Sequence, residues 1–296
     1  MRKLFGLGFL SLLLVVLWAV IQPQNNQLSA TTNRNQPDYS QQMMQSHLGD
    51  RPVASNAIAP APTVPVTSER VTYATVDGKP ITGYLARPAN STTPLPGIIV
   101  IHEWWGLNEN IEQMTERLAG EGYAALAVDL YAGPVAQTSE QARALTQAAG
   151  QMPQLLEDNL KQAYQYLTTE QNSPKIASLG WCFGGSWSLN TALLLPTELD
   201  AAVIYYGGQL VTESDRLDSL QMPILGLFGA LDQNPSVETV RTFETALNEL
   251  GKSAEIYVYE GADHAFANPS GTRYNAQAAE DAWEKTTAFL SQHLKG

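Results

Sequence analysis

Residues 175–185 read KIASLGWCFGG, and this stretch decides the fold. Residues 175–179 are typical of a strand, and residues 184–195 have the pattern of a helix. Between them, residues 180–184 form a G-x-C-x-G pattern, in which small residues permit a sharp strand-to-helix turn. Such a turn exposes the central side chain, and the start of the following helix favours a thiolate. We therefore interpret Cys182 as a nucleophile, the alternative being an inert buried thiol.

Strand-like and helix-like segments alternate on both sides of this stretch. The further predicted strands are residues 98–101, 123–130, 201–206, 224–228 and 254–259. The further predicted helices start near Asn108 and cover residues 139–150, 153–170, 236–250 and 275–294. Residues 71–76 and 81–86 predict an opening β-hairpin that turns at Asp77-Gly78. This alternation predicts an α/β fold, a mostly parallel sheet with helices on both faces and a binding crevice beyond the carboxyl ends of the strands.

Two more candidate residues follow predicted strands. Asp232 comes after residues 224–228, and His264 comes after residues 254–259. A nucleophile, an acid and a histidine in this order are typical of the α/β-hydrolase architecture. Alone, Asp232 fits a turn acid and His264 an ordinary imidazole, but together with the cysteine they predict a triad in which His264 is the base. Asp263 is a rival acid, although the backbone would have to fold back for its carboxylate to reach the adjacent ring.

Residues 102–108, HEWWGLN, directly follow a predicted buried strand. An α/β hydrolase places the second donor of its oxyanion hole here, so we expect the backbone N–H groups of Trp104 and Phe183 to form that hole. Glu103 lies among tryptophans, a setting that perturbs a carboxyl pKa and suits proton exchange with the thiol. An acidic residue near a helix start is the alternative reading of Glu103. Trp105 is either a substrate contact or a packing residue.

Four motifs together resemble the dienelactone hydrolase (carboxymethylenebutenolidase) family. They are residues 102–108 (HEWWGLN), 129–131 (DLY), 180–185 (GWCFGG) and 261–266 (GADHAF). The resemblance covers about residues 69–296 and implies an α/β-hydrolase fold with a Cys-His-Asp triad. It also implies hydrolysis of an enol-lactone through an acyl-cysteine, with no metal and no organic cofactor. Finally, it implies that Glu103 interacts with the thiol at rest and gives way to substrate.

The substrate-carboxylate site departs from the family's pattern. The family arginine four residues after the catalytic histidine is Asn268 here, and the serine directly after the histidine is Ala265. A second family arginine corresponds to Arg143, but the tyrosine expected four residues later is Gln147. An uncharged amide cannot pair with a carboxylate as a guanidinium does. We therefore expect the chemistry on an ester or lactone other than dienelactone, with Arg143, Asn268 and Trp105 as candidate substrate-binding residues.

The amino-terminal part differs in composition from the rest. Residues 1–21 begin with basic side chains and continue as an uncharged, mostly apolar run that is long enough to span a bilayer. This pattern predicts a signal peptide or signal anchor, and we expect a retained anchor with the hydrolase domain outside the cytoplasm. Residues 22–68 are rich in Gln, Asn and Pro and predict a disordered linker, in which His47 is solvated and binds no metal. The folded domain is then residues 69–296.

Composition limits the partners. The chain has 17 Lys and Arg against 29 Asp and Glu, and its net charge of -12 disfavours a nucleic-acid partner. A single cysteine cannot form an intramolecular disulfide. We predict a monomer that acts on a small ester or lactone and meets the membrane only through its amino-terminal segment. Two other function classes stay open, a non-catalytic binding domain on a hydrolase scaffold and a thiol redox protein that needs a partner thiol.

Overall fold

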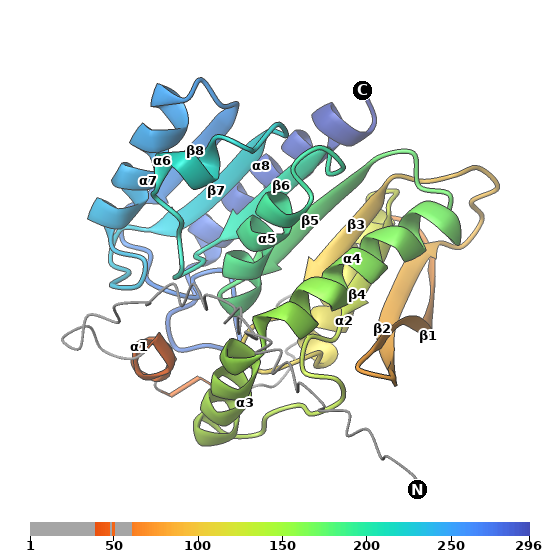
Figure 1. Ribbon diagram of the computed structural model, residues 1–296, viewed down its shortest axis with the longest axis horizontal. Coiled ribbons are helices and arrows are strands. Elements are labelled where there is room, and N and C mark those ends of the chain that lie inside the picture. The colour runs from red at the N-terminus through yellow and green to blue at the C-terminus, as the bar shows by residue number, and fades with distance from the viewer. Residues whose placement is uncertain (1–38, 48, 51–60) are drawn as a thin grey trace, which may run out of the picture. The chain divides into compact units, whose positions relative to one another are not determined.

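A computed structural model of the protein describes residues 39–47, 49–50 and 61–296, and its centre is an eight-stranded sheet (Figure 1). The strands are β1 (Val66–Val76), β2 (Lys79–Pro88), β3 (Gly97–Ile101), β4 (Ala124–Val128), β5 (Ile176–Trp181), β6 (Ala201–Tyr205), β7 (Ile224–Gly229) and β8 (Ala254–Tyr259). Their order in the sheet is β1-β2-β4-β3-β5-β6-β7-β8. Strands β3 to β8 run parallel, whereas β1 and β2 form an antiparallel hairpin joined to β4. This arrangement confirms the predicted α/β-hydrolase fold and its opening hairpin.

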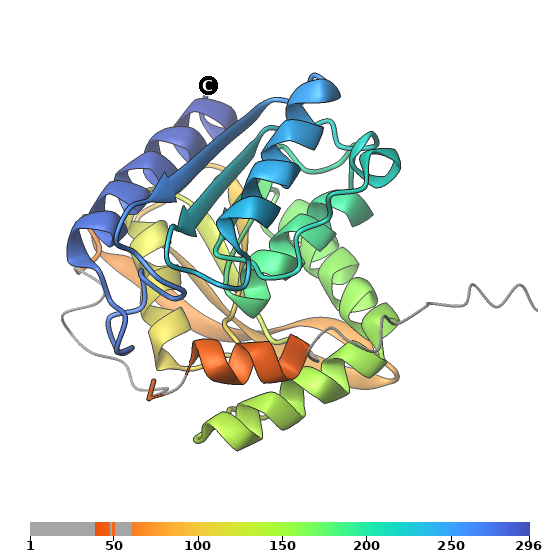
Figure 2. The ribbon, with the colours of Figure 1, turned by 90° about the vertical axis from the view of Figure 1, so that its left-hand side faces the viewer.

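Helices cover both faces of the sheet. They are α1 (Tyr39–Ser46), α2 (Glu109–Gly120), α3 (Ser139–Gln151), α4 (Pro153–Thr169), α5 (Phe183–Leu194), α6 (Ser214–Leu217), α7 (Val237–Glu249) and α8 (Ala276–Leu294). Helices α2 and α8 pack on one face, and α4, α5 and α7 pack on the other (Figures 1 and 2). Two of the helices, α1 and α6, were not predicted; α6 is a single turn, too short for an apolar stripe to mark it.

The central strands have the burial that their sequences predict. Every residue of β3, β4, β5 and β6 is buried, because helices cover both faces of these continuous apolar runs. Caps set the starts of helices that follow the strands: Asn108 accepts the backbone N–H of Ile111 at α2, and Ser236 accepts that of Thr239 at α7. Because β3 to β8 run parallel, the carboxyl ends of β3, β5, β7 and β8 lie at one edge of the sheet, where the loops that follow them carry the candidate site residues.

Helix α1 lies at this same edge, beside α3 (Figure 2). It falls within residues 22–68, which were predicted to be a disordered linker, and the prediction of a solvated His47 is wrong because that side chain is fully buried. Local composition misled here because the segment gains its burial from distant parts of the chain rather than from its own apolar stripe. Residues 1–21 lie outside the described residues. None of the helices described has the length and apolar character needed to cross a membrane.

Candidate active site

Cys182 occupies the sharp turn between β5 and α5. Its backbone has a positive φ of 58° with ψ -116°, a strained conformation for a residue other than glycine, which persists only when its surroundings enforce it. The flanking glycines are required by close backbone contacts: a Cβ on Gly184 would lie 2.2 Å from the carbonyl oxygen of Ile101, and one on Gly180 would lie 2.2 Å from that of Gly184. The Cys182 N–H donates to the carbonyl oxygen of Tyr205 at 3.0 Å. The G-x-C-x-G stretch thus forms the expected elbow.

The predicted base and acid are in contact. Nδ1 of His264 lies 2.8 Å from Oδ2 of Asp232, and both side chains are buried. The other carboxylate oxygen accepts the backbone N–H of Asn234 at 2.8 Å. Because Nδ1 donates to the carboxylate, Nε2 is left as an acceptor; it is buried and has no hydrogen-bond partner in the part of the chain that the structure describes. Three loops that are distant in sequence thus bring these residues to Cys182, with side-chain ligand atoms of His264 and Cys182 within 4.8 Å.

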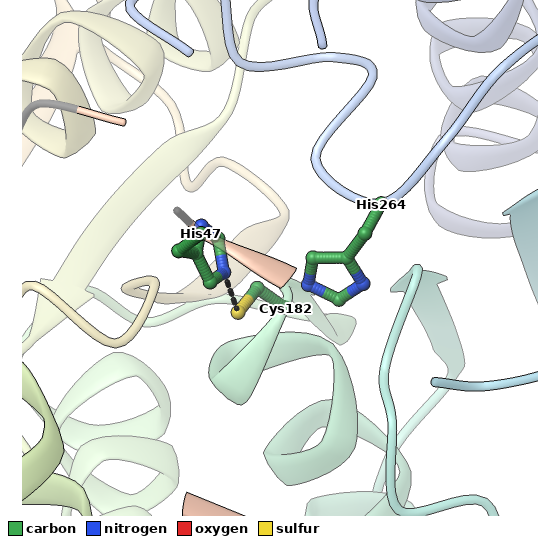
Figure 3. Close-up of side chains that lie close together, drawn as sticks. All are labelled: His47, Cys182 and His264. Atoms are coloured by element: carbon green, nitrogen blue, oxygen red, sulfur yellow. Dashed lines mark hydrogen bonds between the residues drawn. The ribbon is translucent and has the colours of Figure 1, made fainter. Parts of the chain in front are cut away.

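A second histidine, which sequence reasoning missed, is the hydrogen-bond partner of the thiol. Nε2 of His47 lies 3.1 Å from Sγ of Cys182, and Figure 3 shows the cysteine between the two imidazole rings. Nδ1 of His47 lies 2.8 Å from Oδ2 of Asp50. Asp50 is held in turn by Arg273 Nη2 at 3.1 Å and by the backbone N–H of Thr272 at 3.0 Å. A signal was present in the sequence, a histidine followed three residues later by an acid, but nothing local connected it to the elbow.

Burial and pairing set the protonation of the His47–Asp50 pair. Burial lowers the pKa of His47 to about 4, although its hydrogen bond to Asp50 acts in the opposite direction. For Asp50, burial acts to raise the pKa, but the hydrogen bonds from His47 and Thr272 outweigh it and bring the pKa to about 2. The pair is therefore a neutral imidazole held by a carboxylate. The ring of His47 also stacks on Trp104, with centroids 4.7 Å apart.

The thiol itself is protonated in this closed state. Burial raises the pKa of Cys182 well above its usual value, and the nearby carboxyl group of Glu103 raises it further. The backbone N–H groups of Phe183 and Trp104 interact with the sulfur and act to lower its pKa. These are the two groups predicted to form the oxyanion hole. Both therefore point into the space where an oxygen bound next to the sulfur would lie.

Glu103 is buried and is bonded to Asn268. Its Oε2 accepts Nδ2 of Asn268 at 2.6 Å, while its Oε1 is buried without a hydrogen-bond partner among the described residues. Burial, and then the negative charge of Asp50, raise the pKa of Glu103 to about 8. Asn268 Oδ1 also accepts Oγ of Ser270 at 2.7 Å. Asn268, expected to contact substrate, holds Glu103 in this state, and the thiol hydrogen-bonds to His47 instead of to the glutamate that the resemblance implied.

The remaining candidates lie around the segment that closes the site. Trp105 is 1% exposed and contacts Trp104 edge to face, with centroids 4.9 Å apart; the same indole lies 6.2 Å from the ring of His47. Arg143 is half-buried on α3, the helix beside α1, and its part in substrate binding stays a prediction. Cys182 is fully buried, and His47 lies directly against its sulfur, so in this state His47 covers the nucleophile.

Comparisons with known proteins agree with this geometry. The sequence model of the Dienelactone hydrolase family matches residues 81–294. A "Putative carboxymethylenebutenolidase" of Saccharolobus solfataricus is 32% identical over 74% of this chain and 96% of its own. A protein of the same name from Escherichia coli O157:H7 is 33% identical over 73% of this chain and 84% of its own. Residues 81–294, which the family model matches, contain the elbow, Asp232 and His264, whereas His47 and Asp50 lie before them.

Solved structures give the same result. The "Putative Dienelactone Hydrolase" of Klebsiella pneumoniae is 30% identical, with a TM-score of 0.69, and covers 77% of this chain and 99% of its own. A dienelactone hydrolase-like phosphotriesterase, P91, from metagenomic libraries has a TM-score of 0.69 over 77% of this chain and 98% of its own. At 24% identity, P91 shares the fold alone.

Proposed function

This chain belongs to the dienelactone hydrolase family and acts on ester or lactone bonds, and we propose that it cleaves them through Cys182, His264 and Asp232. One observation carries this mechanism: a histidine oriented by a carboxylate at 2.8 Å has a second nitrogen that no described residue hydrogen-bonds, beside a cysteine on a strained elbow. That arrangement of nucleophile, base and orienting acid is the one that acyl transfer needs.

The reaction starts once the segment bearing His47 has moved aside. Nε2 of His264 takes the proton of the Cys182 thiol, and the thiolate attacks the carbonyl carbon of the substrate. The C–O π electrons move to oxygen, and the backbone N–H groups of Trp104 and Phe183 hold the resulting negative charge. Collapse of this intermediate breaks the ester C–O bond, and the leaving alkoxide takes the proton from His264. His264 then takes a proton from water, and the oxygen of that water adds to the acyl carbon. Collapse breaks the C–S bond and releases the carboxylic acid, and the Cys182 thiolate takes the proton back from His264.

The surroundings of the sulfur favour an uncharged acyl group. Asn268 stands where the family pattern has an arginine, and its amide is bonded to Glu103 and Ser270. A substrate carboxylate would lie beside the Glu103 carboxyl group there, and the uncharged amide of Asn268 cannot neutralise it as a guanidinium would. We propose small neutral esters or lactones with an apolar acyl part, which Trp104 and Trp105 would contact.

The test is turnover of an activated aryl ester by the parent and by Cys182→Ala. We expect the variant to lose at least roughly a thousandfold in kcat, as enzymes of this kind do when the nucleophile is removed. Mass spectrometry of the parent, incubated with a slowly hydrolysed ester, should place an acyl group on the peptide that contains Cys182. Thr197→Ala, on the surface, is the control. Equal rates in parent and Cys182→Ala would refute the mechanism. Absence of any hydrolysis that depends on this cysteine, across a broad panel of esters, would favour a binding domain.

A further inference from the structure

We propose that Cys182, His264 and His47 form a binding site for a thiophilic transition-metal ion, zinc or copper, when the amino-terminal segment closes over the elbow. The three side chains are buried, and one ligand atom from each lies within 4.8 Å of the others. Figure 3 shows the sulfur between the two rings. Two imidazoles and a thiolate are donors that zinc and copper prefer in proteins.

Both imidazoles are oriented as metal-bound histidines usually are. In each, Nδ1 lies 2.8 Å from a carboxylate oxygen, that of Asp50 for His47 and that of Asp232 for His264. Metal-ligating histidines commonly donate their second ring N–H to a carboxylate, which fixes the tautomer and the direction of the other nitrogen. The arrangement therefore leaves Nε2 of both rings available to an ion. A hydrolytic triad contains one histidine–carboxylate pair, whereas this cluster contains two, one for each histidine that would bind the ion.

An unpaired nitrogen gives independent support. Nε2 of His264 is buried and has no hydrogen-bond partner among the described residues, although buried polar atoms are nearly always paired. In the closed state the Cys182 thiol hydrogen-bonds to His47 and not to Nε2 of His264. An ion at the centre of the cluster would bind Nε2 of both rings and the sulfur at once. The S–H bond would break on binding, the sulfur would bind the ion, and the proton would leave to solvent.

The amino-terminal segment adds a fourth donor, the soft thioether sulfur of Met43, and the carboxylates near the cluster favour a cation. The backbone N–H of His47 donates to the carbonyl oxygen of Met43 at 3.1 Å, so the two side chains lie one helical turn apart on the same face. Sδ of Met43 is 3.8 Å from Sγ of Cys182. The carboxylates of Asp50 and Asp232 lie behind the two rings, and Arg273 bonds to Asp50, so a cation at the cluster improves the charge balance. Two histidines, a cysteine and a more distant methionine suit copper, while the first three alone suit zinc.

The test measures metal binding by the full chain, purified in mild detergent and stripped with a chelator. Co²⁺ serves as the visible stand-in for zinc, and Cu⁺ is titrated against a chromophoric chelator. We expect one equivalent to bind, with a thiolate-to-cobalt charge-transfer band and release of a proton. Cys182→Ser and His47→Gln should abolish the band, and Asp50→Asn should weaken binding about 10- to 100-fold, as loss of a carboxylate behind a metal-bound histidine does. His293→Gln, on α8, is the matched control and should bind as the parent does.

Either of two results would overturn the proposal: no thiolate band in the parent, or a band of unchanged affinity in His47→Gln. Met43→Leu distinguishes the ions, because a selective loss of Cu⁺ affinity identifies copper and unchanged affinities identify a three-ligand zinc site. Thermal unfolding of each variant shows whether a lost band reflects a lost fold, and Asp50→Asn keeps the test decisive if His47→Gln is unstable. These measurements use no ester, so failure of the hydrolytic mechanism and failure of the metal site give different results.

Discussion

Glu103 is a buried carboxyl group, one oxygen of which has no partner within the described ranges, and its protonation couples the fold to pH. Burial raises its pKa from 4.5 to about 8, while Asn268 stabilises the charged form through one hydrogen bond. A raised pKa means that the folded protein holds this proton more tightly than the unfolded chain does. The stabilisation is fully present below pH 4.5 and is lost as the pH rises toward 8. Glu103 thus makes the closed site less stable in mild alkali.

The first prediction concerns this pH dependence. Between pH 5 and pH 8, the free energy of unfolding of the metal-free parent should fall relative to that of Glu103→Gln, because the amide has no proton to lose. Urea unfolding of both proteins, measured at several pH values in that window, gives the comparison. Glu249→Gln, on an exposed face of α7, is the control. If the free energies of unfolding of parent and Glu103→Gln differ by the same amount at every pH in this window, the fall in stability does not come from ionisation of Glu103.

At the scale of elements, the elbow depends on how closely α5 approaches β3. The start of α5 sits against the end of β3 because Gly184 has no side chain: an added Cβ would meet the carbonyl oxygens of Ile101 and His102 at 2.2 and 2.6 Å. Backbone atoms cannot move aside as the tip of a flexible side chain can. Position 184 therefore requires glycine because a side chain would not fit, and not because the backbone there needs a positive φ.

The second prediction is that Gly184→Ala destabilises the fold by about 3 kcal/mol or more, since the strand and helix must separate. Gly150→Ala, in α3, is the matched control, because an added Cβ there meets no atom of residues 39–47, 49–50 or 61–296 within 4 Å. It should leave stability unchanged or raise it by up to about 1 kcal/mol. Thermal unfolding of both variants measures the two effects. Similar melting temperatures would show that the close approach of α5 to β3 does not limit the residue at Gly184.

The third prediction concerns Asp50, which follows α1 and links the segment bearing His47 to the rest of the site by hydrogen bonds. Asp50 joins His47 to Arg273 and Thr272, so Asp50→Ala should release the segment and expose the thiol. In chelator-treated protein, iodoacetamide should label Cys182 slowly in the parent and at least roughly tenfold faster in the variant, because labelling follows local opening. Asp158→Ala, exposed on α4, is the control. Labelling at parent rate in Asp50→Ala would mean that this acid does not hold the segment closed.

At the scale of the whole molecule, the sheet brings the loops after β3, β5, β7 and β8 to one edge, and α1 lies at that same edge. We propose that residues 1–21 anchor the chain in a membrane with the hydrolase domain outside the cytoplasm. The fourth prediction is that the full chain, expressed in bacteria, fractionates with membranes, and that a reporter active only outside the cytoplasm works when fused after Gly296. A chain lacking residues 1–21 should lose both properties. Reporter activity independent of these residues would contradict the proposal.

Much of the architecture follows from local pattern. Short continuous apolar runs and period-3.6 apolar repeats, together with glycine and asparagine at element ends, predicted the sheet, the hairpin and most of the helices that cover them. The elbow was also predictable, because the spacing of glycines around Cys182 is itself the requirement for the turn. The order of cysteine, acid and histidine then made Asp232 and His264 the candidates for the acid and the base, since the carboxyl ends of parallel strands meet at one edge.

Only the tertiary structure decided which groups surround the sulfur. His47 lies 135 residues from Cys182 along the chain, and Asn268 lies 165 residues from Glu103. Contacts over such separations leave no periodicity in the sequence, and a polar segment rich in Gln and Asn has the same composition whether it is solvated or held by an acid and an arginine. The sequence therefore determined that Cys182 would lie on the turn between a strand and a helix at this edge of the sheet. The folded chain determined that a second histidine covers it, because that contact depends on where the whole sheet places its loops.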